Sequence, residues 1–179
     1  MRMSDTIDVL EREQPLSFAF EDLMKYHGPG SPGGVAHAFK VMERGFALLE
    51  PEGLLQRREV SLRTSFGGPG ARDGFEIVTR AVTGERYVID PALARPGNGR
   101  TREKFVFELS YRDHSVTLVL REGYVTDEFL DLARKKGLTP EEEARLDQLK
   151  REMAERVMAS PAADVYDAER LLRQPGSPE

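Results

Sequence analysis

Cysteine and tryptophan are both absent from this chain of 179 residues. Without cysteine there is no disulfide framework, iron–sulfur cluster, thiolate zinc site or cysteine nucleophile, and this absence fits a reducing compartment. A long apolar run is also missing, because the first segment, MRMSDTIDVLEREQ, is polar and acidic and has the features of neither a signal peptide nor a membrane span. We therefore expect a cytoplasmic protein without a membrane partner.

Basic residues are fewer than acidic ones over the whole chain, which carries a formal net charge of −5. Together with the lack of tryptophan, this argues against nucleic acid as a partner. The charge is unevenly distributed, however, since residues 57–121 contain twelve lysines and arginines against eight acids. A site for a small anion is therefore possible on an acidic protein.

The length favours one domain with some helical additions. We expect a flexible leader over residues 1–14, an α+β core domain over 15–123, appended helices over 124–173 and a disordered tail over 174–179. The composition of the two ends, polar and without periodicity, is typical of frayed termini.

Two helices are expected before the first strand. Residues 17–26 have the pattern of a short helix. The second begins at Ser31, which can act as an N-cap, followed by Pro32 in the first turn. Its apolar residues recur at spacings of four and three and form one stripe, and Pro51 ends it; the stripe consists of Val35, Phe39, Met42, Phe46 and Leu49.

Alternating residues then predict strands at 57–65, 87–89, 105–111 and 116–120, the last two as a hairpin. Between the first two strands, Asp73 followed by Glu76 has the pattern of a capping box and predicts another helix. The order helix, strand, helix, three strands indicates an α+β fold with a mixed sheet.

Helix starts are also expected at Thr126, at Thr139 with Glu142, and at Ser160, so that the chain is helical to its end. The middle helix has a narrow apolar seam, which is typical of a helix that lies on the domain surface or packs against another chain. A homodimer formed through these helices is one prediction; the seam consists of Leu146, Leu149, Met153 and Val157.

Two helices follow glycine-rich loops, at residues 28–33 and 67–70. Free N–H groups at helix starts attract anions, and glycine lets a ligand come close to the backbone. Gly28, Gly30 and Gly33 match GxGxxG, but this motif should follow a strand, and two prolines remove N–H groups that a pyrophosphate needs.

Only three histidines are present. His37 lies opposite the apolar stripe of its helix, together with Lys40 and Arg44, so we expect it on a solvated face. His114 is expected to be exposed in the hairpin turn. His27 differs, because it precedes a constrained loop and can project beside a helix start. The arginines of residues 95–102 form a basic loop that solubility alone can explain, with an anion site as the alternative.

The segment YHGPGSPG, from Tyr26 to Gly33, resembles the His-Gly-His-x-Cys-Pro-Gly motif of the FmdE-like family of formylmethanofuran dehydrogenase subunits. A second family motif, Cys-x-x-Asp-Ala-x-Gln running to Thr-Gly, is similar to residues 70–76 and the following Thr83-Gly84. The resemblance implies an α+β domain of the type seen in the catalytic domain of glyceraldehyde-3-phosphate dehydrogenase. It also implies an accessory subunit of a molybdenum or tungsten enzyme, or a stand-alone protein that binds metal near the two motifs.

The departures from the family pattern fall on the metal chemistry. His27 matches the first family histidine, while Pro29, Ser31 and Gly70 stand where the family has a histidine and two cysteines. Proline and glycine provide no side-chain ligand, and a serine hydroxyl is a poor one beside a thiolate. We therefore expect a degenerate site in which His27 holds at most a weakly bound divalent metal such as zinc.

The candidate ligand-binding residues are His27, Gly28, Ser31 and Asp73. Three functions stay open: a family-like module that binds a small anion or a metal, a structural protein that dimerises through its last helices, and an enzyme acting with formylmethanofuran dehydrogenase. No catalytic group is identified, and stand-alone activity is not expected.

Overall fold

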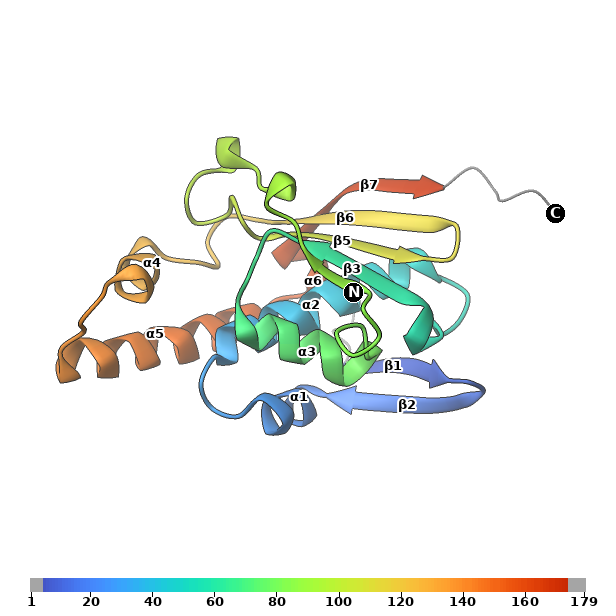
Figure 1. The fold of residues 1–179 in the computed structure, drawn as a ribbon, viewed down its shortest axis with the longest axis horizontal. Helices are drawn as coiled ribbons and strands as arrows, with labels where there is room; N and C mark the ends of the chain where they lie inside the picture. The colour runs from blue at the N-terminus through green and yellow to red at the C-terminus, as the bar shows by residue number, and fades with distance from the viewer. Residues whose placement is uncertain (1–4, 174–179) are drawn as a thin grey trace.

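A long central helix, α2 (Pro32–Leu49), lies between two layers of the molecule. The computed structural model describes residues 5–173. A five-stranded sheet lies on one side of α2 and the adjacent α3 (Pro69–Thr79), and a two-stranded hairpin with α1 (Phe20–His27) lies on the other (Figure 1). The expected α+β class is confirmed, and none of the helices within residues 5–173 is both long and apolar enough to cross a bilayer.

The first residues form a hairpin, so the expected flexible leader is wrong. Strands β1 (Thr6–Glu11) and β2 (Gln14–Ala19) pair antiparallel, and β2 occupies the first part of the helix expected at residues 17–26. Ile7 and Val9 alternate with polar residues and are buried against the helices. Burial of this one face holds the hairpin in place despite its polar composition.

Helix α2 begins and ends as its sequence predicts, with Pro32 at the first turn and its last residue just before Glu50. Ser31 is the N-cap residue, although its side chain makes no capping hydrogen bond. The helix is buried nearly all around rather than along one stripe, because the sheet, α1, α3 and α5 surround it. Consequently, the polar side chains of His37 and Lys40 are also enclosed.

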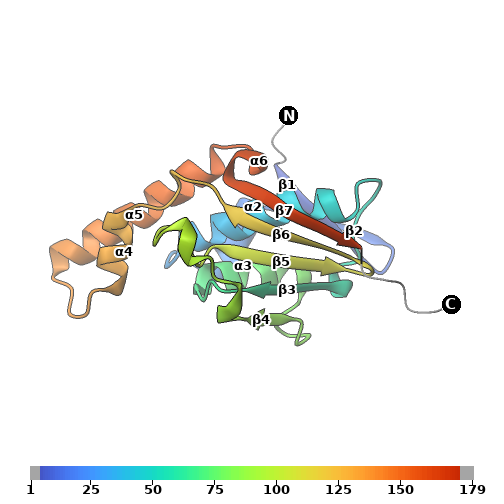
Figure 2. The same ribbon diagram turned by 90° about the horizontal axis from the view of Figure 1, so that it is seen from above.

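The main sheet has the strand order β4-β3-β5-β6-β7, and Figure 2 shows the strands with α2 and α3 behind them. Strand β3 (Val60–Thr64) pairs parallel with β4 (Tyr87–Ile89) and antiparallel with β5 (Val106–Tyr111). The predicted hairpin is confirmed by the pairing of β5 with β6 (His114–Leu120). The sheet is therefore mixed, as expected.

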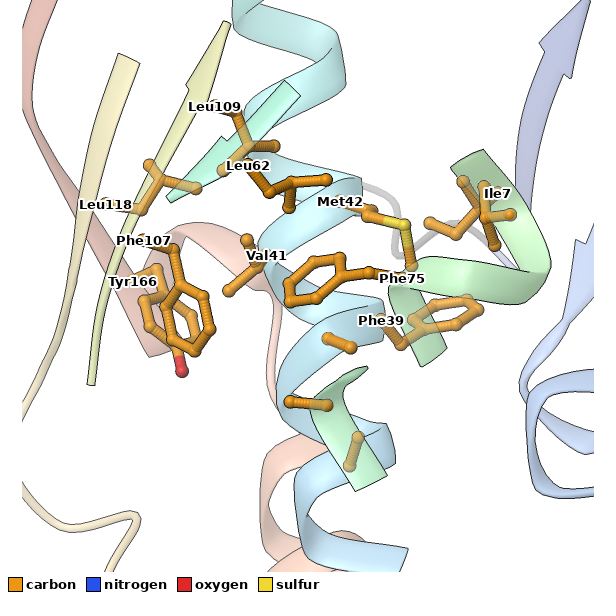
Figure 3. Close-up of a cluster of buried hydrophobic side chains, with 14 of the residues drawn as sticks. Ile7, Phe39, Val41, Met42, Leu62, Phe75, Phe107, Leu109, Leu118 and Tyr166 are labelled. Carbon is orange, nitrogen blue, oxygen red and sulfur yellow. The ribbon is translucent and has the colours of Figure 1, made fainter. Parts of the chain in front are cut away.

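The hydrophobic core fills the space between this sheet and α2. In Figure 3, side chains from β3, β5 and β6 point toward α2, and Phe39 and Ile7 lie on the opposite side of the helix. Alternation in the strands explains this arrangement, since Val60, Leu62 and Thr64 are buried while Arg63 between them is exposed.

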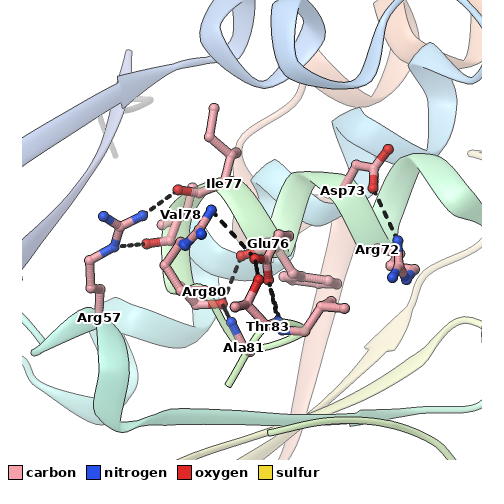
Figure 4. A network of polar contacts seen from close by, with 12 residues as sticks. Arg57, Arg72, Asp73, Glu76, Ile77, Val78, Arg80, Ala81 and Thr83 are labelled. Atoms are coloured by element: carbon pink, nitrogen blue, oxygen red, sulfur yellow. Dashed lines mark hydrogen bonds and ion pairs between the residues drawn. The ribbon is translucent and has the colours of Figure 1, made fainter. Parts of the chain in front are cut away.

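The N-cap of α3 is Gly68, five residues before the predicted cap Asp73, and the helix begins at Pro69. Glu76 does not complete a capping box. Its carboxylate accepts hydrogen bonds from the backbone N–H groups of Val82 and Thr83, and so fixes the turn after the helix (Figure 4).

The C-terminal part contains three helices but does not stay helical. Helices α4 (Asp127–Arg134), α5 (Pro140–Met158) and α6 (Ala162–Val165) start where the sequence predicts, within two residues. The segment Tyr166–Arg173 is then a strand, β7, which pairs with β6, so the appended-helix region expected to reach residue 173 is wrong at its end. The expected tail at 174–179 lies outside the described residues.

The apolar seam of α5 packs within the chain. Leu149, Met153 and Val157 are buried, and Met153 lies against Gly33 at the start of α2, where a β-carbon would approach its sulfur to 2.7 Å. Helix α5 was expected either on the surface of its own domain or packed against another chain. In the structure it lies on the surface of its own domain. Homodimerisation stays a prediction.

Helices α2 and α3 approach each other at backbone distance because glycines lie at their crossing. A β-carbon on Gly34 would lie 3.0 Å from the Ala71 nitrogen, and one on Gly74 would lie 2.8 Å from the Ala38 β-carbon. A β-carbon on Gly70 would overlap the Ser31 carbonyl oxygen. The glycines at both ends of the sequence Gly-Ala-Arg-Asp-Gly thus permit a close contact between the helices. A larger residue at either position would push the two helices apart.

We expect Gly70→Ala to lower the free energy of unfolding by about 1–3 kcal/mol, the usual cost of overpacking, because backbone rather than a flexible side chain must move. Urea denaturation measures this change. Gly30→Ala is the matched control, since its β-carbon would meet nothing within 4 Å. Equal stability of the two variants would contradict the proposed helix contact.

Candidate ligand-binding site

The two glycine-rich loops predicted to carry function lie side by side. Gly28, with a φ of 87°, ends α1, and its N–H donates to the Met24 carbonyl oxygen at 2.7 Å. The next residues lead into α2 at Ser31, whose carbonyl oxygen lies against Gly70 in the first turn of α3. The starts of α2 and α3 therefore meet.

His27 and Asp73 form a direct pair between α1 and α3. The distance from His27 Nδ1 to Asp73 Oδ2 is 2.8 Å, and the side chains are 8% and 26% exposed. Asp73 also lies near the guanidinium of Arg72, as Figure 4 shows. His27 Nε2 is buried and has no hydrogen-bond partner among the described residues.

The structure also contains a cavity of about 330 Å³. One wall is the meeting point of the two helix starts, with Ser31, Gly33, Gly34 and Gly70. None of His27, Gly28 and Asp73 is among the described residues that line it. The structure therefore brings all four predicted site residues into one neighbourhood, but only Ser31 reaches the cavity.

Another wall of the cavity is apolar. Phe66 and Phe105 stack with ring centroids 4.3 Å apart, and α4 and α5 complete the wall with Phe129, Leu130 and Met153. Figure 1 shows α4 at the far end of the molecule from the β1–β2 hairpin, above α5. Helix α4 is joined to the body by ion pairs of Arg100 with Asp127 and Asp131.

His37 lies at the cavity and is fully buried, so its expected place on a solvated face is wrong. Its ring packs 4.8 Å from that of Phe105, and Nδ1 lies 2.7 Å from the Tyr166 hydroxyl oxygen. Tyr166 is the first residue of β7. It covers the face of α2 that was expected to be exposed to solvent. Burial lowers the pKa of His37 to about 3, so the ring is neutral at pH 7.

The hydrogen bond to Tyr166 determines which nitrogen of His37 carries the proton. A buried hydroxyl hydrogen needs an acceptor, and Nδ1 is the partner of Tyr166 among the described residues. Nδ1 therefore accepts, which leaves the ring hydrogen on Nε2. This Nε2–H is buried and finds no acceptor within the described part of the chain.

Four cationic residues, Arg100, Lys104, Arg134 and Lys150, also line the cavity. Lys150 donates to the Gly30 carbonyl oxygen at 3.1 Å, and Arg100 is paired with α4. Lys104 and Arg134 are exposed and have no acidic partner within residues 5–169. Of the predicted basic loop, only Arg100 reaches the cavity.

The donor set does not fit a firmly bound metal. Zinc sites use three or four protein ligands, and no group of three or more suitable side chains occurs among residues 5–173. His27 resembles a metal-binding histidine in one respect, because a carboxylate holds its Nδ1 and leaves Nε2 unpaired. It supplies a single nitrogen.

A scan against protein-family models and a search of curated proteins found no match to this chain. The likeness to the FmdE-like family therefore depends on the two motifs and on the order of elements.

Sequence reasoning missed His37 and the cations at Lys104, Arg134 and Lys150. One signal for His37 was present, since it follows Gly33 by four residues and Gly34 by three, and so lies above them on one helix face. The cations come from distant segments whose proximity depends on how α4 and α5 fold back.

The buried His37 makes a testable contribution to acid sensitivity. Its pKa is about 3 in the folded chain and near 6.5 when unfolded, so the unfolded chain binds more protons between these pH values. As pH falls from 6.5 toward 3, the free energy of unfolding should decrease by up to about 1.4 kcal/mol per pH unit from this group.

Urea denaturation across this pH range measures the slope. It should be shallower for His37→Gln than for wild type, whereas His114→Gln, at a half-exposed histidine, should retain the steep slope. Identical slopes for wild type and His37→Gln would show that the group does not titrate as described.

Proposed function

We propose that this chain is a small-ligand-binding module, similar to the FmdE-like family of formylmethanofuran dehydrogenase subunits, and that its ligand is an anion held in the cavity between the starts of α2 and α3. The observation that carries this proposal is the cavity itself, formed where two glycine-rich helix starts meet and lined by four cationic residues. We place this activity in the cytoplasm.

Backbone donors support an anionic ligand. The first N–H groups of a helix have no partner within the helix, and the dipole adds partial positive charge. Gly33, Gly34 and Gly70 occupy first-turn positions and line the cavity, and Gly34 is the least buried of the three. The proposal places the ligand against these first turns, where helix N–H groups attract anions.

The local charge supports the same ligand. Arg100, Lys104, Arg134 and Lys150 come from different segments of a chain whose overall charge is −5, and the fold gathers them around one opening. Such a concentration of positive charge attracts anions to a protein that repels them elsewhere. A binding module of this kind is also compatible with an accessory subunit, which needs no catalytic group of its own.

Removing the two unpaired cations should weaken anion binding. We expect Lys104→Ala with Arg134→Ala to raise the Kd for small organic and inorganic anions several-fold at low salt, because the attraction is screened as salt increases. Isothermal titration against a panel of carboxylates, phosphate and sulfate measures this effect.

The matched control replaces two other exposed cations, Lys25 and Lys136, which do not line the cavity. This double variant should bind like wild type. If no anion in the panel binds wild type, or if both double variants lose binding equally, the proposed function is wrong.

A weakly held divalent metal at His27 is a second candidate, favoured by its unpaired Nε2 and by the Asp73 carboxylate on Nδ1. With one protein nitrogen available, we expect protein purified without a tag to contain much less than one equivalent of zinc. Added zinc should shift the ring signals of His27 in NMR spectra, and His27→Ala should remove the response.

His114→Ala is the control for this experiment, because His114 pairs with Asp113 at the hairpin turn, away from both loops. A full equivalent of zinc that survives in His27→Ala would contradict a site at His27.

A further inference from the structure

We propose that the cavity selects an organic carboxylate with an apolar body, and that the carboxylate accepts a hydrogen bond from His37 Nε2–H beside the glycine N–H groups of α2 and α3. This inference rests on the proposed anion-binding function and specifies its ligand class. It depends on a buried side chain rather than on the helix starts alone.

His37 provides an unsatisfied donor in the cavity wall. The ring is fully buried, and Nδ1 is occupied by Tyr166, which is not among the described residues lining the cavity. Nε2 is the other ring nitrogen, buried and without a partner among the described residues, and the proposal directs it toward the cavity that His37 lines. A buried donor without a partner is energetically unfavourable, and a ligand oxygen that accepts from it would remove this cost.

The neighbouring donors lie on the same side of α2. Gly33 and Gly34 precede His37 by one helical turn, so their N–H groups lie below its ring on one face. These donors are all uncharged, and the cations are exposed or already paired. Neutral donors suit a monoanion better than a phosphate dianion, whose second charge would need a buried cation.

The apolar wall determines the rest of the ligand. The ring of Phe105 lies 4.8 Å from that of His37. A ligand carboxylate bonded to His37 would therefore lie next to an apolar surface, to which Phe66 and Phe129 also belong. A cavity of about 330 Å³ is at the small end of ligand pockets, so the ligand must be small. An inorganic ion would make no favourable contact with the apolar wall. An aryl- or alkyl-substituted carboxylate uses both walls.

The first experiment compares ligands on the wild-type protein. Isothermal titration with 3-phenylpropionate, its neutral amide and inorganic phosphate should give the lowest Kd for the carboxylate. The protein has only three histidines, so ¹⁵N NMR of the imidazoles resolves each one. The carboxylate should shift the His37 Nε2–H signal and leave that of His114 unchanged.

The second experiment removes the donor. His37→Met should raise the Kd for 3-phenylpropionate roughly 10- to 100-fold, the usual effect of losing a hydrogen bond to a charged group. His37→Gln keeps an N–H donor and should recover part of the affinity. His114→Met is the matched control and should bind like wild type. Circular dichroism checks that each variant is folded, and the NMR experiment decides the question if His37→Met is not.

The outcomes separate this inference from the proposed function. If phosphate binds as tightly as the carboxylate, or if folded His37→Met retains full affinity, the ligand class is wrong and the anion site remains. If the carboxylate binds while the His37 signal does not move, His37 is not the donor. If neither anion binds wild type, both proposals fail.

Discussion

The close contact between α2 and α3 is the constraint on which the site depends. Three glycines, Gly34, Gly70 and Gly74, let the two helices meet at backbone distance. This contact places the first turns of both helices at one point, and α3 also carries Asp73, which pairs with His27 of α1. A wider crossing would separate the two helix starts and open the cavity wall to water.

A second consequence of this packing is that residues 35–42 of α2 have no solvated face. The sheet, α3 and α5 enclose this part of the helix, and polar residues are buried with it. Lys40 pairs with Glu43 at 2.9 Å, whereas His37 is neutral and hydrogen-bonds to Tyr166. Enclosure thus converts a histidine that would titrate near neutral pH into a fixed hydrogen-bond donor.

Local signals in the sequence were sufficient for much of the fold. Proline and Ser31 located the start of α2, alternation located β3 and the β5–β6 hairpin, and a capping box located α5 at Thr139. These features depend on neighbours within a few residues, and so do the loops that lead into α2 and α3.

The errors concern elements whose structure depends on distant partners. The segment from Thr6 and the strand from Tyr166 have polar sequences, and each is held by one buried face or by pairing with a strand elsewhere. The misplacement of His37 follows from the second error, because β7 supplies the tyrosine that covers it. For the candidate site, the meeting of the two loops was predictable, but the cavity beside them was not.

The way α4 is attached has a consequence for any measurement of affinity. This helix forms one side of the cavity and lies between Gly123 and Gly137. Leu130 attaches it to the core, and exposed ion pairs of Arg100 and Arg145 add to this attachment. Such pairs weaken as ionic strength rises. Salt therefore competes with the ligand for the cations and also weakens the ion pairs that contribute to the attachment of α4. Affinities determined in dilute buffer will consequently overstate occupancy at physiological ionic strength.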